Sequence, residues 1–388
     1  MKLRRTRVAT CTLVAALTLG TTAGTLAVAG SAVAAPSNPA SQNGWSVLSG
    51  AAAEAAPDGS VTLSWTTSRT REVRVYASTN PSAPALTGRQ VAVTKGTSVT
   101  VTGLDPAQRW YFQLVPDRNP FAGVVVATRG LGLSGAGNAR DLGGYRTSLG
   151  FTVKYGQVFR SDALAKLTDA DLAKLDHMGV ETAADLRTDF EVGLNGPDKV
   201  PAGTDVLRVP VSDGGMYQKL NEVIASKDPV KQAEALGNGK AEQLLVDANR
   251  SFVSDPAQRA QFAQVVRRIA NGETLLYNCS AGKDRTGWMS AIVLTAVGVD
   301  RATVTQDYLL SNTYLKASND RTKAGLKAAG LMQNPDLLDP LLGVQKQYLD
   351  AAFDEVAKQY GSFDRFLRDG LGLDGATLAK LRLRMLTV

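Results

Sequence analysis

The chain has 388 residues, of which 44% are hydrophobic and 20% are charged, a balance typical of folded proteins that excludes an intrinsically disordered chain. Its length accommodates two domains, or one large domain with insertions. The formal net charge is +7, but residues 1–34 contain four of the basic residues and no acidic one. The remainder, with 39 basic against 36 acidic residues, lacks the basic excess of a nucleic-acid-binding protein.

Residues 1–34 have the features of a secretory signal peptide. A basic leader precedes an apolar stretch from about Leu13 to Val33, and Ala32-Val33-Ala34 provides small residues at the cleavage spacing. Glycine and threonine interrupt the apolar stretch, which disfavours stable membrane insertion. We therefore expect a secreted protein, cleaved after Ala34, whose mature chain begins with a flexible lead-in over residues 35–43.

Cysteine and histidine are scarce, and this excludes several kinds of site. Cys11 lies in the expected signal peptide, so Cys279 remains as a thiol without an internal disulfide partner. The only histidine is His177, which we expect on the surface at the end of a helix. A Ser-His-Asp triad would have to use this one histidine, and a zinc site would have no second histidine and no cysteine beyond Cys279. We expect no metal and no cofactor.

Residues 44–128 have the pattern of a small all-β sandwich domain. Short alternating segments are separated by turn-rich stretches. Trp65 and the segment 103–106 (Gly-Leu-Asp-Pro) resemble the early core tryptophan and the corner of a fibronectin type III domain, although Trp110 stands where that family has a corner tyrosine. The expected strands are 61–65, 73–76, 98–101 and 111–114.

From about Leu131 the pattern changes to alternating strands and helices, which predicts an α/β domain extending to residue 388. Thr168 and Asp171 are spaced as a capping box, and Asp255 followed by a proline is a typical helix start. The expected strands are 182–186 and 274–277, and a helix is expected through 288–297.

Residues 216–254 form a helical insertion just before the second of these strands. Asp228-Pro229 and Gly237-Asn238-Gly239 interrupt it. Two interpretations remain open. The segment is either a mobile lid over a functional site or a surface insertion without a gating role.

The residues between the expected strand 274–277 and the following helix carry the chemistry. Cys279 and Arg285 are separated by five residues, and a thiol at a helix N-terminus beside cations is readily deprotonated. Backbone N–H groups of such a loop cradle an anion, and Arg285 can hold two phosphate oxygens. Thr286 can donate to the sulfur. The expected phosphate-binding residues are Ser280, Ala281, Gly282, Lys283 and Arg285.

The Cys-x5-Arg-Thr pattern resembles the signature of the protein tyrosine phosphatase superfamily. Gly-Lys-Asp-Arg-Thr-Gly-Trp at 282–288 is similar to bacterial secreted tyrosine and lipid phosphatases. The resemblance implies a central sheet flanked by helices over residues 131–388, and a phosphate monoester hydrolysed through a cysteinyl-phosphate on Cys279. Similar motifs flank the loop at 138–145, 159–162, 185–188 and 307–312.

The proton donor for the leaving group is expected among three carboxylates. The resemblance places Asp284 first, Asp185 second and Asp141 third. Asp185 has an alternative structural role, paired with an arginine such as Arg140 or Arg187, and Asp141 is expected chiefly to support the loop. The family usually has histidine before the nucleophile, whereas this chain has Asn278. Because asparagine cannot carry a charge, the Cys279 thiolate is expected to form less readily.

The expected substrates are phosphotyrosine, and also phosphoserine, phosphothreonine and phosphoinositides, since Lys283 would compensate the extra charge of a lipid headgroup. The expected partners are thus a phosphorylated protein or a phosphoinositide. One alternative is a catalytically weakened protein that binds a phosphate ligand. Another is a sulfur transferase or an arsenate reductase, which the Lys283-Asp284 pair and the segment 307–312 disfavour.

Overall fold

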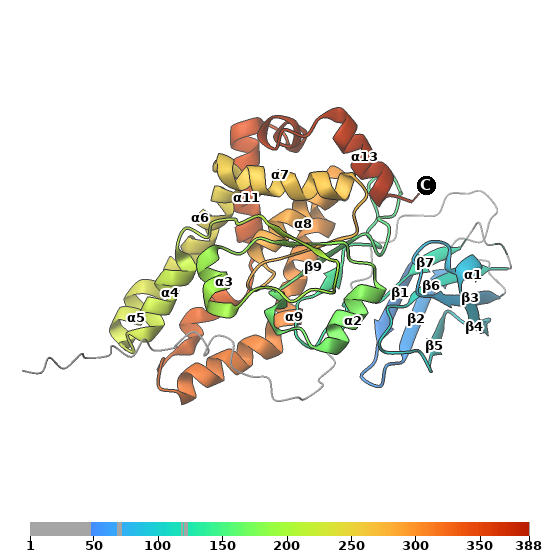
Figure 1. The fold of residues 1–388 in the computed structure, drawn as a ribbon, viewed down its shortest axis with the longest axis horizontal. Coiled ribbons are helices and arrows are strands. Elements are labelled where there is room, and N and C mark those ends of the chain that lie inside the picture. The colour runs from blue at the N-terminus through green and yellow to red at the C-terminus, as the bar shows by residue number, and fades with distance from the viewer. Residues whose placement is uncertain (1–47, 68–71, 118, 120–122, 388) are drawn as a thin grey trace, which may run out of the picture.

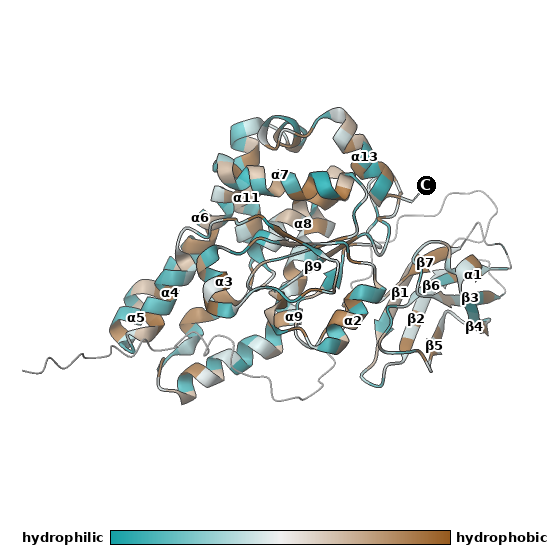
Figure 2. Ribbon diagram, viewed as in Figure 1, coloured by the Kyte–Doolittle hydropathy of each residue, from teal (hydrophilic) through white to brown (hydrophobic). Residues whose placement is uncertain are grey.

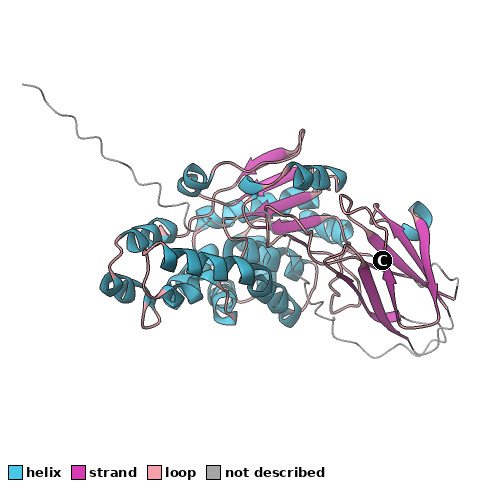
Figure 3. Cartoon of the chain, turned by 90° about the horizontal axis from the view of Figure 1, so that it is seen from below, coloured by secondary structure: helices cyan, strands magenta, loops and turns pink. Residues whose placement is uncertain are grey.

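The computed structural model describes residues 48–67, 72–117, 119 and 123–387 (Figure 1). The expected signal peptide and lead-in lie outside the described residues. Within them, a smaller N-terminal β unit, residues 48–126, lies beside a larger α/β unit (Figures 1 and 3).

The N-terminal β unit consists of two antiparallel sheets with the strand orders β1-β2-β5 and β4-β3-β6-β7 among the described residues. Alternate residues of β2, including Leu63 and Trp65, are buried in a core shared with Phe112 of β6. Period-two burial of this kind is expected where each sheet covers the other. The expected strands β2, β3, β5 and β6 are confirmed, whereas the likeness to fibronectin type III stays a prediction. The elements are β1 (Leu48–Ala55), β2 (Val61–Thr67), β3 (Val73–Ser78), α1 (Pro84–Thr87), β4 (Arg89–Thr94), β5 (Ser98–Val101), β6 (Tyr111–Pro116) and β7 (Val124–Val126).

The α/β unit is built on a sheet with the order β11-β10-β12-β9-β8 in the described part of the chain. The first four strands are parallel, and β8 pairs antiparallel with β9. The expected α/β class is confirmed. Because parallel strands end at the same edge of a sheet, the segments after β9, β10 and β12 meet there. The strands are β8 (Arg140–Asp141), β9 (Val158–Ser161), β10 (Thr182–Asp185), β11 (Asp205–Arg208) and β12 (Leu275–Asn278).

Both faces of this sheet are buried, and successive residues of β12 pack on opposite faces. Leu275 and Tyr277 belong to the large core under α7, α8 and α13, whereas Leu276 belongs to a smaller core that includes Leu175 of α2. Parallel sheets are typically covered by helices on both faces. Helix α8 is accordingly pale to brown over most of its length in Figure 2, and α2 carries teal turns.

Caps fix where several helices begin. Thr168 and Asp171 form the expected capping box at α2, and the Asp255 carboxylate caps α7 with Pro256 in its first turn. The helices before β12 are α2 (Asp169–His177), α3 (Asp189–Asn195), α4 (Met216–Ala225), α5 (Pro229–Leu236), α6 (Lys240–Ser254) and α7 (Pro256–Ala270). Those after it are α8 (Asp284–Ala296), α9 (Arg301–Ala328), α10 (Asp339–Leu342), α11 (Lys346–Tyr360), α12 (Phe363–Arg365) and α13 (Gly375–Met385). Shorter turns are η3 (Leu164–Lys166), η4 (Pro335–Leu338) and η5 (Phe366–Gly370).

Candidate active site

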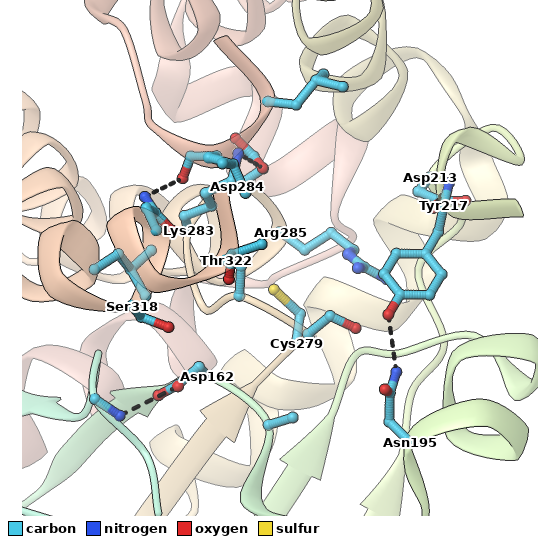
Figure 4. A pocket seen from close by; sticks show the side chains of 18 of the residues that line it. Asp162, Asn195, Asp213, Tyr217, Cys279, Lys283, Asp284, Arg285, Ser318 and Thr322 are labelled. Carbon is cyan, nitrogen blue, oxygen red and sulfur yellow. Dashed lines mark hydrogen bonds and ion pairs between the residues drawn. The ribbon is translucent and has the colours of Figure 1, made fainter. Parts of the chain in front are cut away.

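The loop between β12 and α8 forms the floor of a cavity of about 340 Å³. Cys279 directly follows the last residue of β12, and α8 begins at Asp284. The thiol is only 3% exposed. In Figure 4 its sulfur lies between Arg285 and the side chains of α9. The amide groups of a helix N-terminus attract anions. An anion bound at the sulfur would therefore lie close to the amide groups of both the loop and the first turn of α8.

Gly282 gives the loop its tight curvature. Its φ is +65°, in the left-handed region, and a Cβ added there would lie 2.4 Å from the backbone nitrogen of Asp162. Two side chains hold the loop's outward-facing carbonyls. The Asn138 amide donates to the oxygens of Ala281 and Gly282 at 3.0 and 2.9 Å, and Arg160 Nη2 donates to the latter at 2.8 Å. The loop's shape is thus fixed from β9 and from the segment before β8.

Asp307 of α9 fixes the side chains that hold the loop. Its carboxylate pairs with Arg160 Nη1 at 2.6 Å and Arg140 Nε at 3.3 Å, and it accepts a hydrogen bond from the Tyr145 hydroxyl at 2.9 Å. Burial opposes ionisation of this carboxyl, but the arginines outweigh it and keep its pKa well below the usual range. The motifs singled out at 138–145, 159–162 and 307–312 therefore meet in one buried cluster.

Glu191 orients Arg285. Its two carboxylate oxygens accept from Arg285 Nη1 and Nη2 at 2.7 and 2.6 Å, and one of them also accepts from Ser280 Oγ at 2.6 Å. Although burial opposes ionisation, the hydrogen bonds and charge of Arg285 lower the pKa of Glu191 to about 2. Glu191 was not among the expected site residues. Thr188 and Glu191 do have the spacing of a capping box, and they form one at α3, but that pattern does not reveal the partner Arg285.

Lys283 and Asp284 lie side by side at the cavity (Figure 4). Lys283 Nζ is 2.8 Å from Asp284 Oδ2 and 3.0 Å from the Gly343 oxygen. The Tyr308 hydroxyl donates to Asp284 Oδ1 at 3.1 Å. Burial and the nearby charge of Asp284 raise the pKa of Tyr308 well above its ordinary value, so it remains a donor at neutral pH. Asp284, the first candidate for the proton donor, is thus held at the cavity by two donors.

Asp185 lies outside the cavity in which a proton donor is expected. It is absent from the described cavity lining, and its carboxylate binds Arg187 at 2.9 Å and also Arg208. Arg187 in turn pairs with Asp198 at 2.8 Å. The geometry favours the structural alternative, with Arg187 as the partner, and we leave Asp185 out of the proposed proton donors.

Asn278 joins the same cluster. Its Nδ2 donates to Asp198 Oδ2 at 2.8 Å. Burial and the charge of Asp185 raise the pKa of Asp198. Asp198 was not a sequence candidate. Asn278 therefore anchors the end of β12 to the segment after α3.

Two further expectations concern residues near the loop, and both stay predictions. Asp141 was expected to support the loop, but its carboxylate accepts from Arg109 Nη2 and from the backbone of Gly143 and Gly156. It acts on the loop at most indirectly. Thr286 was expected to donate toward the sulfur, but its buried hydroxyl oxygen has no hydrogen-bond partner among the described residues.

The cavity also brings together residues that were not sequence candidates. Asp162, which follows β9, is one of them, and burial raises its pKa to about 6 despite hydrogen bonds from two backbone amides. Tyr217 of α4 faces the cavity and accepts a hydrogen bond from Asn195 at 3.1 Å (Figure 4). Phe252 of α6 adds to this wall. The insertion 216–254 therefore forms part of the cavity.

The described residues contain no cluster of three or more His, Cys, Asp or Glu side chains placed to hold a metal ion. Likewise, no helix in the described ranges is long and apolar enough to cross a membrane.

Comparison with known proteins agrees with the geometry. The model of the tyrosine phosphatase family matches residues 131–387. Triple specificity protein phosphatase PtpB of Mycobacterium tuberculosis is 32% identical over 64% of this chain and 96% of its own length. A Cupriavidus necator protein, provisionally named a tyrosine-protein phosphatase, is 32% identical over 67% of this chain and 90% of its own. A tyrosine-protein phosphatase of Nostoc commune is 28% identical over 58% of this chain and 73% of its own length. The chain therefore belongs to the tyrosine phosphatase family and is a phosphoric monoester hydrolase of the protein tyrosine phosphatase type.

Proposed function

We propose that the protein hydrolyses phosphate monoesters through a cysteinyl-phosphate on Cys279. The observation that carries this proposal is the common cavity, which is lined by the buried Cys279 and by Lys283 and Arg285 at the start of α8. The thiolate attacks phosphorus, an S–P bond forms, and the P–O bond to the leaving group breaks. Water then cleaves the S–P bond, which releases inorganic phosphate and restores the thiolate.

Asp284 is the proposed proton donor to the leaving oxygen. It lies on the loop itself, and Lys283 and Tyr308 fix both of its carboxylate oxygens. Asp162 is the alternative within the cavity, because its pKa of about 6 leaves it partly protonated near neutral pH. Arg285, held by Glu191, would bind two phosphate oxygens and follow them into the transition state.

The proposed substrates are phosphotyrosine, phosphoserine or phosphothreonine, and phosphoinositides. A cavity of about 340 Å³ lies within the range of small-molecule sites. Lys283 brings a second cation to the cavity lining, where it is paired with Asp284, and the Mycobacterium tuberculosis relative is named a triple specificity phosphatase. Both observations support a substrate range wider than phosphotyrosine alone.

The test of the mechanism is Cys279→Ser, assayed with an aryl phosphate in the presence of a metal chelator. We expect full wild-type activity under chelation and loss of turnover in the variant, with an unchanged circular dichroism spectrum. Equal activity in the variant would rule out the cysteinyl-phosphate. A wild-type protein that binds phosphopeptide without releasing phosphate would instead match the binding-protein alternative.

Asp284→Asn and Asp162→Asn separate the two candidate acids. A protonated acid matters most for a poor leaving group. Loss of the true donor should therefore reduce hydrolysis of a phosphoserine peptide far more than that of an activated aryl phosphate. If a substitution lowers the hydrolysis of both substrates equally, the residue that it replaces is not the proton donor.

Lys283→Ala tests the lipid substrates. We expect kcat/KM to fall further on short-chain phosphoinositides than on a phosphotyrosine peptide, because the lipid headgroup carries the additional charge. An equal loss on both substrates would remove the rationale for lipid activity.

We also propose that the protein is secreted after cleavage behind Ala34. The basic leader, the apolar stretch and the small residues before Ala34 support this. Mass spectrometry of the protein from culture medium should give a mature chain beginning at Ala35. An intact N-terminus on cell-associated protein would contradict secretion.

A further inference from the structure

Strand β8 has two residues, and they serve different parts of the molecule. Successive side chains of a strand point to opposite sides. Arg140 is directed toward Asp307 and the cluster that holds the phosphate loop, whereas Asp141 is directed toward Arg109 of the N-terminal β unit. Both side chains are fully buried. The same short strand thus contacts the β unit on one side and the loop's support on the other.

The contact between the two units is closely packed. Arg109 is 5% exposed, and its Nη2 donates to the Thr128 oxygen at 2.9 Å and to Asp141 Oδ2 at 3.0 Å. Its guanidinium also lies 5.2 Å from the ring centre of Tyr111. A Cβ added to Gly156 would lie 2.9 Å from the Tyr111 hydroxyl. The burial of Arg109 and the close approach of Tyr111 to Gly156 are more than a tether between two independent domains requires.

From β8 the connection to the loop takes two steps. Arg140 donates to the Asn138 side-chain and backbone oxygens, and the Asn138 amide donates to the carbonyl oxygens of Ala281 and Gly282. These carbonyls belong to the residues whose amide groups form the phosphate cradle. A shift of β8 would therefore reach the loop through hydrogen bonds between buried groups.

We propose that the N-terminal β unit positions the phosphate-binding loop through β8, and that Arg109 is a positioning residue for catalysis. The inference rests on the proposed cysteinyl-phosphate mechanism. Without Arg109, the Asp141 carboxylate would keep its two backbone donors but lose the guanidinium hydrogen-bonded to it while remaining buried, since the nearby Arg129 donates to the Asp141 backbone oxygen instead. A buried charge without its partner is strongly unfavourable, so β8 and the adjacent turn would rearrange and the loop with them.

The test compares three variants of the full chain, using an aryl phosphate and inorganic phosphate as an inhibitor. Arg109→Ala should lower kcat between about tenfold and a hundredfold and weaken phosphate inhibition, because the cradle itself is displaced. Arg109→Lys retains the charge and should recover part of kcat. Gln108→Ala is the matched control. It removes a contact to His177 across the same junction, 3.0 Å long but exposed and not connected to β8, and should leave kcat unchanged.

A purely structural role for Arg109 would lower the melting temperature without altering kcat or the phosphate inhibition constant of the folded variant, and that outcome would overturn the inference. If Arg109→Ala does not fold, Asp141→Asn carries the same test because it removes the other half of the ion pair, and wild-type kcat in that variant would overturn the inference equally. A wild-type chain without phosphatase activity would contradict the proposed function instead. The two failures are therefore distinguishable.

Discussion

Arg285 depends on a carboxylate that lies 94 residues away in the chain. A guanidinium has a planar fork of donors that matches a carboxylate or a phosphate. Glu191 engages both terminal nitrogens, and its fully buried side chain also binds Ser280. The arginine is therefore set in its orientation before a phosphate arrives, which reduces the cost of ordering it during the reaction.

We predict that Glu191→Gln lowers both kcat and stability. The pKa of Glu191 is about 2 in the folded chain and about 4.3 in an unfolded one. Its ionic contribution is therefore complete above the unfolded pKa and disappears as the pH falls through about 2. The variant should lose about 3 kcal/mol of unfolding free energy at pH 7, and the difference from wild type should shrink below about pH 4.

Urea unfolding at pH 7 and pH 3 measures this difference. Asp189→Asn is the matched control on the same first turn of α3, since the Asp189 side chain is 97% exposed and an exposed ion pair contributes less than about 1 kcal/mol. A difference for Glu191→Gln that is the same at both pH values would contradict the assignment of an ionised Glu191.

Gly282→Ala should abolish the cradle. The position combines a positive φ with backbone atoms of Ser161 and Asp162 within 2.5 Å of the added Cβ, so the loop must move. We expect kcat/KM to fall on the order of a hundredfold. Gly325→Ala on α9 is the control, because nothing lies within 4 Å of its added Cβ. That substitution should stabilise the helix by about 0.5–1 kcal/mol and leave kcat/KM unchanged.

Among the elements, α4 and α5 have the features expected of a moving part. Glycines 214 and 215 precede α4 with positive φ, and Asn238 and Gly239 follow α5 with positive φ. The two helices lie at the edge of the molecule in Figure 1. Of the two, α4 lines the cavity, with Tyr217 and Leu220. Backbone junctions of this kind can absorb the rotation of a hinge.

We predict that vanadate, a phosphate mimic, slows amide hydrogen exchange in α4 and α5 by ordering them over the cavity. Helix α7, which packs on the sheet, serves as the internal control and should exchange at the same rate with and without vanadate. Unchanged exchange in α4 and α5 would favour the alternative of a fixed surface insertion.

Elements with local signals were predictable, and those without them were not. The caps at Thr168 and Asp255 marked the starts of α2 and α7. The two-residue strand β8 has no periodicity to detect, since its position follows from pairing with β9. The motif 138–145, which contains β8, was recognised from its resemblance to the phosphatase family. The opposite roles of Arg140 and Asp141, however, depend on which unit covers each side of the strand.

At the scale of the whole molecule, the buried junction predicts that the two units unfold together. The units are joined by the ion pair of Arg109 with Asp141 and by the contact between the rings of Tyr111 and Tyr155. Differential scanning calorimetry should show one transition, and saturating phosphate should raise its temperature as a whole. Two transitions, of which phosphate shifts only one, would show that the β unit is thermodynamically independent.

The sequence by itself indicated the proposed nucleophile and the proposed phosphate-binding loop, because Cys279, Gly282 and Arg285 lie in one short segment between a strand and a helix. It also determined the α/β class through hydrophobic periodicity. Only the tertiary structure decided the partners of these residues. Glu191 meets Arg285, Asp198 meets Asn278, and Asp185 is held by arginines instead of facing the cavity. Such pairings join segments distant in the chain, and local spacing contains no information about which buried charges will meet.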